Sequence, residues 1–352
     1  MQKTGFKAGL TISPPNIRGI LAVLCGGGHN GFMTLKKRPL GRTGLDVTEI
    51  GLGGYWYKEL EAARANTDVV RKAIDLGVNF VDTAPGYKDS EAVLGEALSG
   101  GYRERVVLST KYYPYDNEDK LEAGRANCRS TVENSLKRLK TDHLDILHMH
   151  WVHSAGDVAR IPDSELGKTL LDLKKSGKIK HIALSEASEL DGEHRMLETA
   201  IPTGFFEVMM VTYNIFLQTA DRKVLDMAKK AGMGVEIMMV LNQPENGKSG
   251  LISPACAAEN IDHLIKEAAL TEKPAYRDPK LFDFLMEGSA KTLPAAAIRF
   301  ALDHPAVSTV VVGTSSPRHL EENLAVSSLA PLSPAIHSRA KELFGNIVKH
   351  IK

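Results

Sequence analysis

The sequence is short of cysteine, of net charge and of long hydrophobic runs. Its three cysteines, Cys25, Cys128 and Cys256, match no metal motif or disulfide framework, so we expect a reducing compartment. The formal net charge of +1 gives no global field that would recruit nucleic acid or an anionic membrane. No apolar run is long enough to span a bilayer. We therefore expect a cytoplasmic protein with a small-molecule partner, either a monomer or a homo-oligomer.

The first 32 residues carry little structural pattern. Residues 17–25 form an apolar run that resembles a weak signal-peptide core, but Leu24 precedes Cys25 where a cleavage site prefers a small residue. Met33 stands just ahead of the first well-patterned segment and is a second candidate start. We expect residues 1–32 to be a disordered or spurious extension and residues 33–352 to form a single domain.

From Val47 onward, apolar β-rich runs alternate with amphipathic stretches, and several of these stretches end at a glycine, a common helix stop. Such alternation predicts a parallel sheet, and continuously apolar strands indicate burial on both faces. Eight repeats favour a closed (β/α)8 barrel; an open doubly wound sheet is the alternative, but no GxGxxG follows the first run. The eight runs are VTEIGLGG, NFVDTA, RVVLSTK, HLDILHMHW, IKHIALS, FFEVMMVTYN, MGVEIMMV and VSTVVVGT.

Three further segments interrupt or extend this repeat. Residues 38–50, with Gly41 and Gly44, predict a β-hairpin that plugs the bottom of the barrel. Residues 241–291 form a long insertion after the seventh run, which we expect to serve as a lid, because long loops at that face of a barrel are usually functional. Residues 333–350 predict one further amphipathic helix.

Four ionisable residues follow consecutive predicted strands. Asp82 ends the second predicted strand and Tyr87 lies in the loop after it, Lys111 ends the third strand, and His150 ends the fourth. Each alone is more often a turn, solvated or packing residue than a catalyst. Barrels carry their chemistry at these strand ends, so together the four side chains predict an active site.

The order Asp, Tyr, Lys, His resembles the aldo-keto reductase superfamily, and the resemblance extends from Leu35 almost to the C-terminus. It implies a (β/α)8 barrel that reduces carbonyl compounds with a nicotinamide cofactor, with Asp82, Tyr87, Lys111 and His150 as the catalytic tetrad. The matching stretches are LGRTGLDVTEIGLGG, NFVDTAPGYKDSEAVLGEAL, LSTK, LDILHMHW, GKIKHIALSEAS and VVVGTSSPRHLEENL.

Carbonyl reduction needs a hydride on carbon and a proton on oxygen, and Tyr87 would supply the proton. Free tyrosine has a pKa near 10, and an ammonium about 4 Å away offers roughly the 4 kcal/mol needed to lower it by about three units. We expect Lys111 to lower the pKa of Tyr87 in this way, with Asp82 keeping Lys111 charged. His150 would orient the carbonyl oxygen, and His148 is a possible substitute.

The resemblance also places the cofactor. Ser315 and Ser316 would bind phosphate at a helix start, and Glu322 and Asn323 would contact the adenine. Gly313 and His319 stand where the family often has a lysine and an arginine for the 2′-phosphate, but Arg318 can compensate, so we expect NADP(H) rather than NAD(H). Glu186 and Met210 replace the asparagine and glutamine that the family often uses at the nicotinamide. The candidate cofactor-binding residues are Gly53, Gly54, Ser185, Glu186, Met210, Gly313, Thr314, Ser315, Ser316, Arg318, Glu322 and Asn323.

Aromatic residues at the ends of the first and fourth runs are the candidate substrate contacts: Tyr55, Trp56 and Trp151. Aromatic walls suit apolar carbonyl compounds. The expected function is NAD(P)H-dependent reduction of an aldehyde or ketone, or the reverse reaction. The alternative is a cofactor-binding regulatory barrel that acts through a protein partner, because Glu186 and Met210 depart from the family's nicotinamide site.

Overall fold

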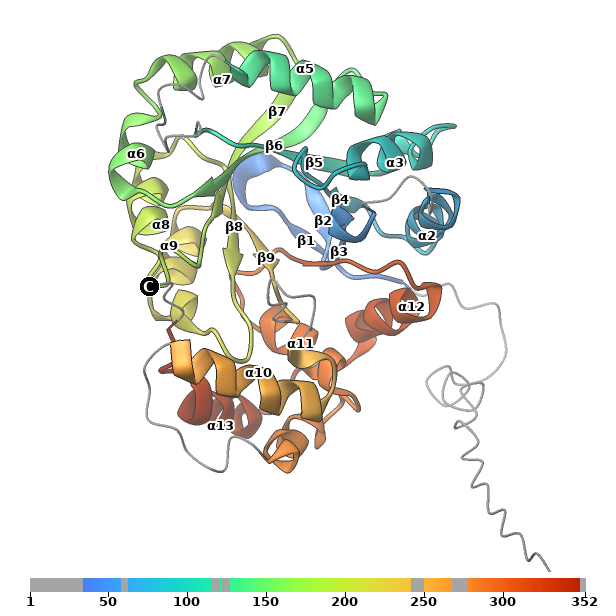
Figure 1. Cartoon of the computed structure of the whole chain (residues 1–352), viewed down its shortest axis with the longest axis vertical. Helices are drawn as coiled ribbons and strands as arrows, with labels where there is room; N and C mark the ends of the chain where they lie inside the picture. The colour runs from blue at the N-terminus through green and yellow to red at the C-terminus, as the bar shows by residue number, and fades with distance from the viewer. Residues whose placement is uncertain are drawn as a thin grey trace, which may run out of the picture. The chain divides into compact units, whose positions relative to one another are not determined.

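Eight parallel strands form a closed barrel in this computed structural model, in the spatial order β10-β3-β4-β5-β6-β7-β8-β9 (Figure 1). The (β/α)8 prediction is confirmed, and the alternative of an open sheet is wrong. The structure describes residues 34–57, 63–115, 121, 127–241, 250–267 and 278–348, so the expected extension over residues 1–32 lies outside the described residues. The barrel strands are β3 (Ile50–Gly53), β4 (Phe80–Asp82), β5 (Val107–Tyr112), β6 (Leu144–Val152), β7 (Ile179–Glu186), β8 (Val208–Thr212), β9 (Gly234–Met238) and β10 (Thr309–Val312).

Helices surround the barrel and connect its strands (Figure 1). In α7, the Ser164 hydroxyl caps the first turn by accepting from the Gly167 N–H, and Leu166, Leu170 and Leu173 form the buried face. The α-helices are α2 (Ala63–Asp75), α3 (Ser90–Ala97), α5 (Cys128–Leu139), α6 (Ala155–Arg160), α7 (Glu165–Lys175), α8 (Arg195–Ala200), α9 (Val224–Lys230), α10 (Pro254–Glu267), α11 (Leu293–Leu302), α12 (Pro317–Ala325) and α13 (Pro334–Phe344). The 3-10 helices are η1 (Gly41–Thr43), η2 (Gly54–Trp56), η4 (Arg103–Arg105), η6 (Ile201–Thr203), η7 (Thr219–Arg222), η8 (Gly250–Ile252), η10 (Pro279–Met286) and η11 (Val326–Ser328).

The predicted hairpin closes the N-terminal end of the barrel. Strands β1 (Lys37–Pro39) and β2 (Asp46–Thr48) pair antiparallel, and η1 connects them. Leu40 and Val47 pack into one buried apolar cluster with residues that include Phe80 and Ile146, near the start of their strands. Gly41 has a φ of +55°, and a Cβ there would lie 2.2 Å from the Gly234 nitrogen. Only glycine therefore allows the hairpin to approach β9 this closely.

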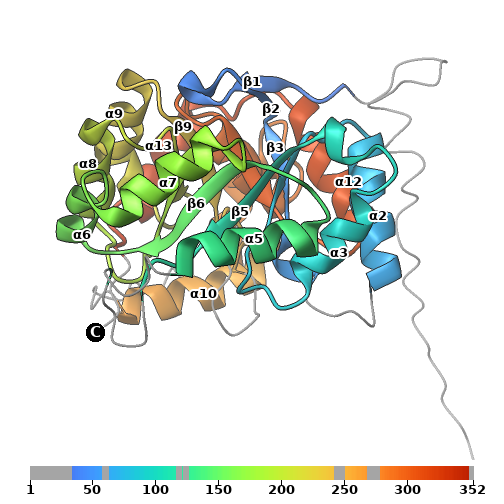
Figure 2. The ribbon, with the colours of Figure 1, turned by 90° about the horizontal axis from the view of Figure 1, so that it is seen from above.

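The insertion after β9 contributes η8, α10 and η10. Figure 2 shows α10 at the end of the barrel opposite to β1 and β2, which is where barrel active sites lie. Residues 242–249 and 268–277 of the insertion lie outside the described residues. The role of the insertion as a lid stays a prediction. None of the described helices is long and apolar enough to cross a membrane.

Candidate active site

The fold brings the four predicted catalytic side chains to one end of the barrel. Asp82 is the last residue of β4, and Lys111 lies on the adjacent strand β5. His150 lies on β6, the next strand, and Tyr87 lies in the turn between β4 and α3. Because parallel strands all present their carboxyl ends to the same side, neighbouring strand ends meet there.

Lys111 and Asp82 form a buried ion pair. The Lys111 ammonium lies 2.5 Å from Asp82 Oδ2 and donates a second hydrogen bond of 2.8 Å to the Thr83 carbonyl. Ser109 Oγ donates to the other oxygen of Asp82 at 3.1 Å. Burial works to lower the pKa of Lys111, but the charges around it, that of Asp82 foremost, outweigh burial and the pKa is raised. Lys111 therefore stays an ammonium at neutral pH.

Tyr87 faces this ammonium. The Lys111 nitrogen lies 5.0 Å from the centre of the Tyr87 ring, and the ring of Tyr55 packs edge-on against it at 5.2 Å. The expectation of a lowered pKa for Tyr87 is wrong for this structure, because burial raises it more than Lys111 lowers it. Tyr87 therefore holds its proton at neutral pH, and Lys111 reduces the cost of releasing it.

His150 lies beside Tyr87, with 6.2 Å between the ring centres. The pairing of β6 with β7 shifts between Met149 and Val152, and Trp151 takes a positive φ of 62°. Such bulges re-aim side chains beside active sites. Burial lowers the pKa of His150 to about 3, helped by the Lys111 charge and by His148. The imidazole is therefore neutral in the physiological range and can donate one hydrogen bond without carrying a charge.

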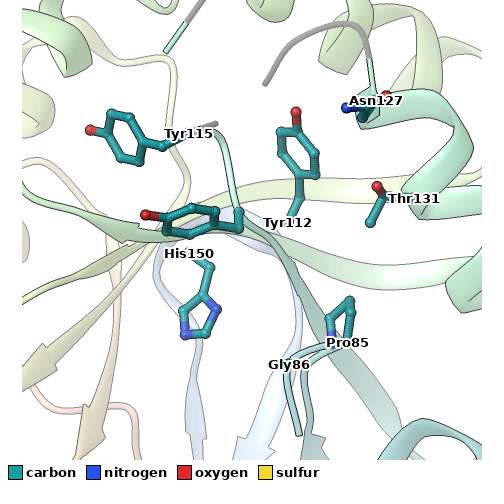
Figure 3. A pocket seen from close by; sticks show the side chains of 8 residues that line it. Pro85, Gly86, Tyr112, Tyr115, Asn127, Thr131 and His150 are labelled. Atoms are coloured by element: carbon teal, nitrogen blue, oxygen red, sulfur yellow. The ribbon is translucent and has the colours of Figure 1, made fainter. Parts of the chain in front are cut away.

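A cavity of about 400 Å³ opens beside His150 (Figure 3). Its walls include Tyr112, Tyr113 and Tyr115 from β5 and the segment after it, three aromatic residues that the sequence analysis missed. The cluster YYPY directly after the strand-ending lysine was the available signal. The lining residues are Pro85, Gly86, Tyr112, Tyr113, Tyr115, Asn127, Thr131 and His150.

Two of the predicted substrate residues, Tyr55 and Trp151, lie near this cavity but do not line it. The Trp151 ring centre lies 6.3 Å from that of Tyr113, and Tyr55 packs on Tyr87. Both Tyr55 and Trp151 are more than two-fifths exposed. Trp56 belongs to η2, but its side chain is outside the part of the structure that is described.

The residues predicted to bind the nicotinamide lie on neighbouring strands, but they provide few hydrogen-bond partners for its carboxamide group. Ser185 on β7 pairs in register with Met210 on β8, and both are buried. Glu186 accepts from the Thr212 N–H at 2.7 Å with one oxygen and lies 2.7 Å from His194 Nδ1 with the other. Both carboxylate oxygens are thus occupied, and the Met210 thioether is a weak acceptor without a donor. These residues do not fit the carboxamide as an asparagine and a glutamine would.

The residues predicted to bind the phosphate end of the cofactor suit their ligand better than those predicted to bind the nicotinamide. Ser316 caps α12, and Arg318 and His319 lie exposed in its first turn, with 3.0 Å between Arg318 Nη2 and His319 Nε2. Backbone N–H groups at a helix start and a nearby guanidinium suit a phosphate. The other predicted residues of this end are buried Thr314, half-buried Gly313 and Asn323, and exposed Ser315 and Glu322.

The last residue of β3, Gly53, and the glycine that follows it, Gly54, both lie where a Cβ would be crowded. A Cβ on Gly53 would lie 3.4 Å from the Gly313 nitrogen on the neighbouring strand connection. A Cβ on Gly54 would lie 2.7 Å from Ser90 Oγ and 2.9 Å from the Asp82 carbonyl oxygen. Gly54 therefore lets η2 pack against the end of the strand that carries Asp82.

One further polar pair lies deeper in the barrel. His148 Nε2 on β6 is 3.2 Å from Glu236 Oε2 on β9, and both side chains are fully buried. His148 therefore does not line the cavity, whereas His150 does. The sequence analysis missed Glu236, and its signal was a lone carboxylate inside the apolar run MGVEIMMV.

Known proteins resemble the chain over most of its length. The family model described as "Aldo/keto reductase family" matches residues 49–344. The L-galactose dehydrogenase of Arabidopsis thaliana is 29% identical over 83% of this chain and 88% of its own length. The NADH-specific methylglyoxal reductase of Escherichia coli is 26% identical over 84% and 94%. A solved structure of a Pseudomonas aeruginosa protein described as an aldo-keto reductase superimposes with a TM-score of 0.58 and 29% identity, covering 83% of this chain and 93% of that one.

The match of the family model covers far more than half of the chain, and the closed eight-stranded barrel agrees with it. The relatives named above are oxidoreductases that act on small molecules. The chain belongs to the aldo/keto reductase family.

Proposed function

We propose that the protein reduces an aldehyde or ketone to an alcohol with a nicotinamide cofactor, with Tyr87 as the proton donor. The observation that carries the proposal is the buried Lys111 ammonium, which lies 2.5 Å from Asp82 and 5.0 Å from the centre of the Tyr87 ring. A pre-formed charge beside a phenol is what a proton-donating tyrosine needs. A barrel core does not need a buried lysine for its stability.

A bound reduced nicotinamide would supply the hydride for the carbonyl carbon, and the side chains of the protein act on the carbonyl oxygen. The raised pKa of Tyr87 keeps the phenol protonated before the reaction. As negative charge grows on the oxygen, the phenol proton moves to it, and Lys111 stabilises the phenolate that remains. Neutral His150 donates a hydrogen bond that orients the same oxygen.

We propose NADPH as the preferred cofactor. The support is the cationic group at the start of α12, where the Arg318 side chain is 64% exposed and only loosely paired with Glu322 at 3.4 Å. That guanidinium is available to a 2′-phosphate, which NADH lacks. The Escherichia coli relative is named as NADH-specific, so the preference needs a direct measurement.

The proposed substrate is a planar aromatic carbonyl compound. Aromatic rings in the cavity wall provide flat apolar surfaces, with 5.6 Å between the ring centres of Tyr113 and Tyr115. The Tyr112 hydroxyl is buried and makes no hydrogen bond with a described residue, and Figure 3 shows it on the side of the cavity away from His150. A polar substituent remote from the carbonyl would give this hydroxyl a partner.

Oxidation of NADPH by 4-nitrobenzaldehyde tests the proposal, with Tyr87→Phe compared to Tyr55→Phe as the matched control. Removing a general acid costs about 10²–10⁴-fold, so kcat of Tyr87→Phe should fall at least 100-fold. Tyr55→Phe removes the hydroxyl of the neighbouring tyrosine but keeps the ring that packs on Tyr87, so its kcat should stay within a few-fold of wild type. Equal activity of Tyr87→Phe and wild type would sink the assignment.

The regulatory alternative gains no support from the comparisons, whose named relatives are oxidoreductases. It would be favoured only by tight cofactor binding without turnover of any compound in a broad carbonyl panel.

A further inference from the structure

The pair of His148 and Glu236 crosses the inside of the barrel. His148 lies on β6 in register with Lys111, and Glu236 lies on β9, three strands further around the barrel. Their side chains meet at 3.2 Å, and the nearest ligand-type atoms of Asp82, His148 and Glu236 all lie within 4.8 Å of one another. The pair therefore lies inside the barrel next to the Lys111–Asp82 ion pair.

Packing does not account for this pair. Both side chains have no exposed surface, and apart from the contact with each other none of their four polar atoms has a hydrogen-bond partner among the described residues. Barrel interiors are usually filled by layers of branched apolar side chains. A buried ionic pair is often no more stable than apolar residues of similar volume, so stability is a poor reason for its presence.

The charges of the cluster balance if the pair holds one proton. Asp82 and Lys111 neutralise each other. With one shared proton, His148 and Glu236 are also neutral as a unit, and the whole cluster carries no net charge, as a dry site requires. Burial raises the pKa of Glu236, which favours retention of that proton. A divalent cation would leave the cluster with a net positive charge beside the Lys111 ammonium.

We propose that His148 and Glu236 hold one proton between them and that its loss weakens Tyr87 as a proton donor. The inference rests on the proposed role of Tyr87. When the pair loses this proton, it gains a negative charge close to Lys111. That charge partly cancels the electrostatic effect of the ammonium on Tyr87 and so raises the pKa of the phenol. The two residues position and tune the catalytic charge without touching the substrate.

Several other groups face the pair or the phenol. Asp82 on β4, Lys111 on β5 and His150 on β6 surround the pair, and Tyr55 after β3 lies against Tyr87. The Thr309 hydroxyl of β10 is buried in register with Glu236, and it does not titrate. Lys111 keeps its proton and His150 its neutral form, so an added ionisation in the alkaline range belongs to the pair or to Tyr87.

The pH profile of kcat tests this proposal. In the wild type, kcat should fall about tenfold on the alkaline side as the pair loses its proton, which corresponds to about one pKa unit at Tyr87. In Glu236→Gln this fall should be absent. The matched control is Glu91→Gln, which removes a buried carboxylate that binds Thr110 and Arg138 outside the site, and should keep the fall.

A second readout needs no turnover. The tyrosinate absorbance of Tyr87, taken as the difference between each protein and its Tyr87→Phe counterpart, should titrate about one pH unit lower in Glu236→Gln than in the wild type. If no carbonyl compound is turned over, this titration still tests the pair, so failure of the proposed function and failure of this inference are distinguishable. If Glu236→Gln does not fold, the doubly substituted His148→Leu, Glu236→Leu chain should fold and show the same shift.

Two results would overturn the proposal. One is an alkaline fall and a tyrosinate titration that are the same in Glu236→Gln and the wild type. The other is inhibition of the wild type by added zinc, reversed by EDTA and absent in Glu236→Gln, which would make Asp82, His148 and Glu236 a metal site instead.

Discussion

Removing the carboxylate partner of Lys111 should destabilise the fold far more than an ordinary polar substitution. The change is Asp82→Asn, which keeps the shape of the side chain and deletes its charge. At 2.5 Å the pair attracts by about 7 kcal/mol at an effective dielectric of 20, and the cost of desolvating two ions offsets much of this. Breaking a buried pair by removing one partner typically costs about 3–5 kcal/mol, because the other charge is left unpaired in the interior. Lys111 is 1% exposed, so water does not replace Asp82.

A double-mutant cycle in urea separates the pair from its surroundings. Asp82→Asn and Lys111→Met should each lower the free energy of unfolding by about 3–5 kcal/mol, whereas the double variant should lose less than the sum by about 2 kcal/mol or more. The exposed Lys168–Glu165 pair is the control, and its cycle should give less than about 1 kcal/mol. The slope of the free energy of unfolding against urea concentration should be the same for all variants. Additivity of the Asp82 and Lys111 substitutions within about 0.5 kcal/mol would refute the reasoning.

Three further predictions follow from single contacts. Arg318→Ala should raise the Kd for NADPH about tenfold or more and leave that for NADH nearly unchanged, and equal losses for both would remove the guanidinium from the 2′-phosphate. Gly95→Ala should lower the free energy of unfolding by more than about 2 kcal/mol, because its Cβ would lie 2.2 Å from the Arg138 carbonyl oxygen, whereas Gly156→Ala, with only one atom at 3.8 Å, should be neutral or stabilising in urea. The pKa of His150 is lowered to about 3 in the folded chain. Between about pH 6.5 and 3, His150 is therefore protonated in the unfolded chain but neutral in the folded chain. Stability should therefore decline as pH falls through this window, and urea titrations of His150→Gln should show a shallower decline; an unchanged decline would mean that another group is responsible.

The strands, the hairpin and most helices follow from patterns that operate along the chain. Apolar runs with β-branched residues and amphipathic stretches that end at glycine are local features, and a chain with eight such repeats has few other ways to bury them. The strand-end positions of Asp82, Lys111 and His150 follow from the same count, because the end of a parallel strand is fixed by where its apolar run ends.

The sequence by itself thus determined the barrel and the placing of Asp82, Lys111 and His150 near strand ends, while only the tertiary structure decided which side chains of the site carry charge. The direction in which the pKa of Tyr87 shifts depends on how completely the fold excludes water from its side chain, and the spacing of residues along the sequence does not determine this. The engagement of Glu186 by Thr212 and the contact of His148 with Glu236 join residues that are 26 and 88 positions apart. Closure of the barrel brings such residues together, and burial then makes the electrostatic interactions between them much stronger than they would be in water.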